Sequence, residues 1–99
     1  MANHYKVKRL ERRTKYDIYA DLLKTVMKRG SCGVTRASYG ANLPIDRAKK
    51  SLRLLASRGF VRAEVTDDSS RYRITKRGME YLEVFGKMRK LFAALSEDL

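Results

Sequence analysis

The chain has 99 residues, which suits one domain with a single modest core. It is 43% hydrophobic and 34% charged, so it can bury a core beneath a highly charged surface. The 23 Lys and Arg residues outnumber the 11 Asp and Glu residues, and the formal net charge of +12 predicts an anionic partner. Nucleic acid is the first candidate. A membrane surface is the second, although no apolar run approaches the length of a spanning helix.

The residues that enzymes use for chemistry are scarce in this sequence. It contains one His and one Cys, and no metal-ligand spacing, paired acidic group or phosphate-binding loop. We therefore expect no catalytic activity, no cofactor, no metal and no small-molecule substrate. With no signal-peptide pattern and only one cysteine, we expect a cytoplasmic protein in which Cys32 is a small residue in a loop.

Residues 1–14 form a basic arm in which Glu11 is the single acidic residue. The expected phosphate contacts in this arm are Lys6, Lys8, Arg9, Arg12 and Arg13. Such an arm binds DNA phosphates or serves only as a solubilising terminus, and the sequence does not decide between the two.

A first helix is predicted to begin near Lys15, because Thr14 and Asp17 have the spacing of a capping box. Apolar residues then recur at helical spacing, and Gly30 ends the helix after two cations. We interpret this helix as a scaffold for the helices that follow. Thr35 is the expected N-cap of a short second helix.

Residues 35–59 have the pattern of a helix-turn-helix. Gly40 and Asn42 tolerate the positive φ that a sharp turn needs, and Pro44 suits the first position of the next helix. Asp46 complements the positive end of that helix, and Gly59 ends it.

The second of these helices has two different faces. Ile45, Ala48, Leu52, Leu55 and Ala56 lie on a core side, and the opposite side is basic. Basic helix faces are commonly just solvated, but Asp46 alone opposes this excess of cations, which favours phosphate binding in a major groove. Leu54 falls on the basic side, where we expect a neighbouring element to cover it.

After Gly59 the hydrophobic period changes from helical to alternating, first around Val61–Val65 and again around Arg71–Ile74. Two strands around a polar turn predict a β-hairpin, which after a recognition helix is the wing of a winged helix. Phosphates would repel Asp67 and Asp68 at its tip. We therefore expect Arg71 and Arg73 to contact the DNA backbone.

A last helix is predicted from Lys76, capped by Thr75, and carries apolar residues at alternating spacings of four and three. This is the seam of a coiled coil. The expected dimer interface consists of Tyr81, Phe85, Met88, Phe92, Leu95 and Leu99. The alternative is a terminal helix that folds back onto its own domain.

The predicted fold is α+β and mostly α: a winged helix-turn-helix with a two-stranded wing and a long C-terminal dimerisation helix. Its parts are the arm (1–14), the winged-helix domain (15–75) and the coiled-coil helix (76–99). The motifs T-R-x-x-Y-x-A-N-L from Thr35 and Y-x-I-T-x-x-G from Tyr72 resemble those of small archaeal winged-helix proteins described as chromatin proteins or transcriptional regulators.

The resemblance covers about residues 16–95 and implies double-stranded DNA binding by a homodimer joined through an antiparallel coiled coil. It also implies a recognition helix from Pro44 to Arg58, a wing from Phe60 to Thr75 and a dimer helix from Lys76. This sequence departs from the family pattern at Pro44, at the acidic wing tip and in its more basic arm. The acidic tip argues against insertion of the wing, and the arm favours extra non-specific affinity.

These features predict a nucleoid-associated DNA-binding protein, either a transcriptional regulator or a chromatin architectural protein. The expected DNA-binding residues are Arg36, Arg47, Lys49, Lys50, Arg53, Arg71 and Arg73. The alternative function is a winged-helix module that binds partner proteins. RNA is a weaker candidate, since little aromatic surface is expected outside the core.

Overall fold

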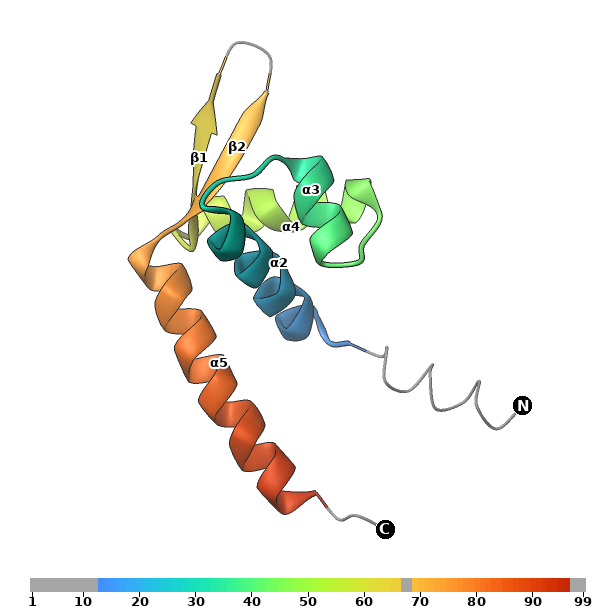
Figure 1. Ribbon diagram of the computed structural model, residues 1–99, viewed down its shortest axis with the longest axis vertical. Helices are drawn as coiled ribbons and strands as arrows, with labels where there is room; N and C mark the ends of the chain where they lie inside the picture. Colours follow the sequence, from blue (N-terminus) through green and yellow to red (C-terminus); the bar gives the residue numbers. More distant parts are fainter. Residues whose placement is uncertain (1–12, 67–68, 97–99) are drawn as a thin grey trace, which may run out of the picture.

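The computed structural model describes residues 13–66 and 69–96. Three helices come first, α2 (Lys15–Arg29), α3 (Val34–Gly40) and α4 (Ile45–Ser57). Strands β1 (Val61–Val65) and β2 (Ser70–Ile74) form an antiparallel hairpin, and α5 (Lys76–Leu95) completes the order. In Figure 1 the hairpin and α5 leave the body formed by α2, α3 and α4 on the same side and extend in opposite directions. The predicted winged helix-turn-helix is confirmed.

Local capping determines both ends of α2, as the sequence predicts. The Thr14 hydroxyl accepts from the amide of Asp17, and the Asp17 carboxylate accepts from the amide of Thr14 at 2.8 Å. This bond from the Thr14 amide holds the pKa of Asp17 below its usual value. Gly30 ends the helix with φ of 78°, a conformation that a side chain would strain.

The predicted turn between α3 and α4 is confirmed, and Asn42 has the positive φ, 57°. Two predictions about where helices begin are wrong. Gly33 rather than Thr35 is the N-cap of α3, because its extended backbone directs its carbonyl to the amide of Ala37. Pro44 is the N-cap of α4 rather than its first residue, because its ψ of 148° is not helical.

The core lies where α2 crosses α3 and α4. Its largest fully buried side chains include Leu22, Leu23, Val26 and Leu52. Three of these side chains come from α2, which contacts both α3 and α4, as the predicted scaffold role of the first helix requires.

Two expectations about apolar residues of α4 are wrong. Ile45, expected in the core, is 48% exposed, because the helix begins at this residue. Leu54, expected to be covered by a neighbour, is 37% exposed. The buried residues of α4 are Ala48, Leu52 and Leu55, so only a narrow stripe of the helix faces the core.

The hairpin is attached to the helical body through the loop after α2. Val61 pairs with Ile74 and Val65 with Ser70, and an isolated bridge joins Cys32 to Tyr72. Cys32 lies in this loop, as expected from the sequence, and its side chain is fully buried in the core. Burial raises the pKa of its thiol.

Helix α5 is joined to the rest of the chain by contacts near its first residue. Thr75 caps it by accepting from the amide of Gly78, and the Tyr81 hydroxyl donates to the carbonyl of Tyr16 at 2.7 Å. Burial raises the pKa of Tyr81 to about 12. Beyond an ion pair between Arg89 and Asp17, the helix extends away from the body (Figure 1). No helix in residues 13–66 and 69–96 is long and apolar enough to cross a membrane.

Candidate nucleic-acid interface

A groove of about 510 Å³ lies where α3, α4 and β2 meet, and we call it the basic groove. Its side chains come from the start of α3, one side of α4 and the start of β2. The lining residues are Gly33, Val34, Thr35, Arg36, Lys49, Arg53, Ser69, Ser70, Arg71 and Tyr72. The groove thus brings together four of the predicted DNA-binding cations, Arg36, Lys49, Arg53 and Arg71, and no acidic residue of the described ranges 13–66 and 69–96 lines it.

The fold determines the position of each cation differently. Lys49 and Arg53 lie one turn apart on the exposed side of α4. Arg36 lies in the first turn of α3, which the adjacent loop holds against β2 through the Cys32–Tyr72 bridge. Arg71 donates from Nε to the Ser31 hydroxyl at 3.1 Å and from Nη2 to the Ser31 carbonyl at 3.0 Å. This anchor keeps the Arg71 guanidinium beside the groove.

The remaining predicted DNA-binding residues do not line the groove. Arg47 and Lys50 are exposed on α4 outside it. Arg73 pairs with Glu64 at 3.1 Å and donates to the carbonyl of Gly30 at 3.4 Å. Arg73 therefore bonds across the hairpin and to the end of α2, and its positive charge is partly neutralised.

Of the predicted arm contacts, Arg13 alone lies within the described residues. It donates to the Asp21 carboxylate and to the carbonyls of Ala41 and Asn42. Lys6, Lys8, Arg9 and Arg12 lie outside the described residues, as do Asp67 and Asp68 of the wing tip.

Sequence reasoning missed the hydroxyl groups of the basic groove. Thr35, Ser69 and Ser70 line it and can donate hydrogen bonds to phosphate oxygens. The sequence pattern around β2 gave no sign that Ser69 and Ser70 belong to a binding surface, because serines are ordinary residues of a polar turn. Their position in the groove beside Lys49 and Arg53 of α4 distinguishes them from other turn serines.

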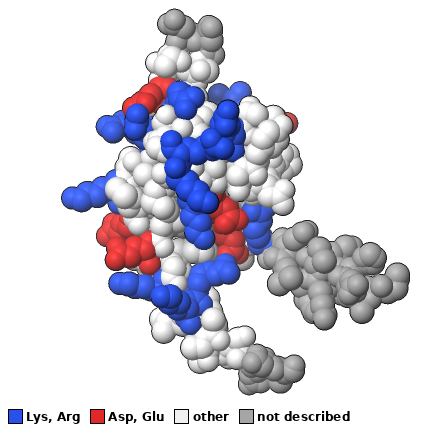
Figure 2. All heavy atoms as spheres, in the orientation of Figure 1, with Lys and Arg blue, Asp and Glu red and all other residues white. Residues whose placement is uncertain are grey.

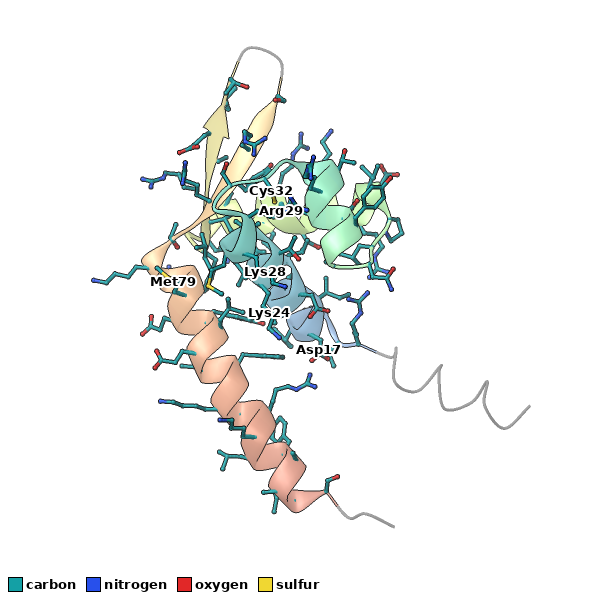
Figure 3. The ribbon with its side chains drawn as sticks, viewed as in Figure 1. Asp17, Lys24, Lys28, Arg29, Cys32 and Met79 are labelled. Carbon is teal, nitrogen blue, oxygen red and sulfur yellow. The ribbon has the colours of Figure 1, made fainter. Side chains whose placement is uncertain are left out.

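A second basic strip was also missed. Lys24, Lys28 and Arg29 lie on α2 and are exposed, and Figure 3 shows them along that helix. In Figure 2 the Lys and Arg side chains form a band along α2 on the face in view. The spacing of four places Lys24 and Lys28 on one side of the helix, a signal that the strong apolar pattern of α2 obscured.

The outer half of α5 carries exposed apolar side chains. Exposure reaches 61% at Phe92 and 79% at Leu95. A groove of about 900 Å³ between the start of α2 and α5 includes Tyr81, Phe85, Met88 and Phe92, four of the predicted dimer residues. Tyr81 also packs against its own core, and Leu99 lies outside the described residues.

No group of three or more His, Cys, Asp or Glu residues suited to a metal ion occurs in the part of the chain that the structure describes. The side chains that line the basic groove include cations and hydroxyl donors, which can bind an anion.

The sequence matches the family model described as winged helix-turn-helix over residues 12–93. Among solved structures, it is similar to Sso10a-2, a DNA-binding protein from Sulfolobus solfataricus, with 31% identity and a TM-score of 0.70. That match covers 83% of this chain and 88% of the other. No curated protein matches the sequence.

Two further structures share the fold at lower identity. A MarR family transcriptional regulator from Silicibacter pomeroyi has 15% identity and a TM-score of 0.66, over 78% of this chain and 53% of that one. The homodimeric winged helix-turn-helix DNA-binding domain of Mb0332 from Mycobacterium bovis has 20% identity and a TM-score of 0.56. That match covers 81% of this chain and 71% of the other.

Proposed function

This chain belongs to the winged helix-turn-helix family, and we propose that it binds double-stranded DNA with α4 as its recognition helix. The basic groove carries the proposal, since four cations from three separate elements line it and the described part of the chain places no acidic residue among them. Cations gathered in this way repel one another in the free protein and are stabilised by an anion. Proteins similar in fold are DNA-binding proteins and transcriptional regulators, which supports the same conclusion.

In the proposed complex, α4 lies in the major groove, which admits one helix. Lys49 and Arg53 contact phosphates along one wall, while Arg36 and Arg71 hold the neighbouring backbone from α3 and β2. Arg47 and Lys50 extend the contact along α4. Arg73 contributes less, because its ion pair with Glu64 partly neutralises its charge.

The sequence preference of this complex is expected to be weak. Helix α4 contains no Asn or Gln that could pair with adenine, and its exposed polar residues are mainly Lys and Arg. Binding without strong preference favours a nucleoid-associated chromatin protein over a regulator of one promoter.

Dimerisation through α5 is the second part of the proposal. Phe85, Met88 and Phe92 repeat at spacings of three and four, and an apolar surface of this extent is rarely left in water. A second copy of α5 would cover it and place two α4 helices on one duplex.

Phe92→Glu is expected to convert the dimer into a monomer, because it places a charge in the apolar seam. The dissociation constant of the dimer should rise by roughly 100-fold, as for loss of an interface hot spot. Sedimentation equilibrium of this variant and of the control Lys90→Glu, on the same helix, would measure the change. A monomeric wild-type protein at micromolar concentration would contradict the dimer.

The DNA proposal is tested by titrating wild-type protein into random duplex and into duplex from its own upstream region, from 50 to 200 mM salt. If the two subunits neutralise about six to ten phosphates, log affinity should fall with log salt with a slope of about −5 to −9. Near-equal affinity for both duplexes supports the chromatin role, and a large preference for one supports a specific regulator.

A protein-interaction module is the second candidate function, and the exposed apolar side of α5 favours it. The two functions predict different results in the DNA titration described above. A module of this kind would leave duplex DNA unbound even at 50 mM salt, and that result would contradict DNA binding.

A further inference from the structure

Arg13 connects the start of α2 to the turn of the helix-turn-helix. Its Nη1 lies 2.7 Å from Oδ2 of Asp21 and 2.7 Å from the carbonyl oxygen of Ala41. Its Nη2 lies 2.9 Å from the carbonyl oxygen of Asn42. One guanidinium therefore joins the N-terminal side of α2, the body of α2 and the α3–α4 turn, 28 residues away in sequence.

The two carbonyls belong to the residues that set the direction of α4. Ala41 is the C-cap of α3, Asn42 has the left-handed φ of 57°, and Pro44 is the N-cap of α4. Within the turn, the amide of Asn42 donates to Tyr39 and the amide of Leu43 to Ser38. These bonds shape the turn, but they do not connect it to α2. Arg13 does.

The surroundings make this contact strong for a residue near the surface. The Arg13 side chain is 24% exposed, and its ion pair with Asp21 combines charge with a short hydrogen bond. Asp21 holds the guanidinium in place, and the planar fork of Arg reaches both carbonyls at once. A Lys side chain has no such fork.

We infer that Arg13 and Asp21 form a clamp that sets the position of the recognition helix, so that Arg13 is a positioning residue and not a phosphate contact. This inference rests on the proposed DNA binding. It replaces the role expected from the sequence, in which Arg13 belongs to the phosphate-binding arm. The clamp acts through the turn and holds α4 at the angle that aligns Lys49 and Arg53 with Arg36 and Arg71.

The two roles predict opposite results for Asp21→Asn. Removing a carboxylate makes the protein more positive, so a purely electrostatic effect would tighten DNA binding. Loss of the clamp would weaken it, and we expect affinity to fall about 5- to 10-fold. The salt slope should stay unchanged, because no phosphate contact is removed. Glu80→Gln, which removes an exposed carboxylate from α5, is the matched control and should bind DNA as tightly as wild type or more so.

Arg13→Lys supplies a second comparison. A phosphate contact would tolerate this change, since Lys retains the charge, whereas the clamp needs the fork and should lose a similar 5- to 10-fold. Amide hydrogen exchange provides a readout that is independent of DNA. The amides of Asn42 and Leu43 should exchange faster in both variants, while those of α5 should not change.

Faster exchange in the turn, together with weaker binding at an unchanged salt slope, would support the clamp. Wild-type exchange at Asn42 and Leu43, or tighter DNA binding by Asp21→Asn, would overturn it. If the wild-type protein failed to bind duplex at all, the proposed function would be contradicted, and the exchange measurement would still test the clamp.

Discussion

The double variant Lys49→Glu, Arg53→Glu is expected to lose DNA affinity by at least about 100-fold at 100 mM salt. Each substitution removes a phosphate contact and adds a repulsive carboxylate to the basic groove, where Arg36 and Arg71 remain. A dimer would lose four contacts, so the magnitude of the salt slope should fall by about three to four. Fluorescence anisotropy of a labelled duplex over a salt series would measure both quantities.

A control with the same change in charge separates local contact from net charge. Lys87 and Lys90 are exposed on α5, which extends away from α4 (Figure 1). Lys87→Glu, Lys90→Glu should reduce affinity only a few-fold, as expected for long-range repulsion screened by salt. Equal losses in the two double variants would mean that α4 has no special role.

The second large effect concerns stability. Gly78→Ala is expected to lower the free energy of unfolding by about 2–3 kcal/mol. A Cβ at this position would overlap the carbonyl oxygen of Phe60 and lie 2.7 Å from Cγ1 of Ile74. The first obstacle is backbone, so α5 would have to move away from the hairpin.

Gly86→Ala is the matched control in the same helix. Nothing lies within 4 Å of a Cβ built at Gly86, so this change gains helix propensity without a clash. It should raise the free energy of unfolding by about 0.5–1 kcal/mol. Urea unfolding of both variants at one protein concentration would measure the difference. A stabilised Gly78→Ala variant would contradict the close packing of α5 on the hairpin.

Sequence could predict the features that depend on near neighbours. The ends of α2 follow from Thr14, Asp17 and Gly30, and the start of α5 follows from Thr75, since all these caps act within a few residues. The positive φ at Asn42 follows from its residue type. The alternation of apolar and basic residues after Gly59 was enough to place both strands.

Features that depend on distant segments could not be predicted. Which cations of α4 share a groove with Arg36 and Arg71 is decided by the packing angles of three elements. The partners of Arg13 are up to 29 residues away, and Cys32 pairs with Tyr72 across the fold. Local reasoning also failed at Gly33, which is the N-cap of α3 in place of the expected Thr35 and directly follows the Cys32 that pairs with β2.

The most direct test of the account is a map of amide chemical-shift changes in the wild-type protein when a short random duplex is added. We predict that the largest changes occur in Gly33–Arg36, in the exposed side of α4 and in Ser70–Tyr72, with little change along the outer half of α5. Changes concentrated on α5, with α4 unaffected, would contradict the assignment of α4 and the basic groove as the DNA-binding surface.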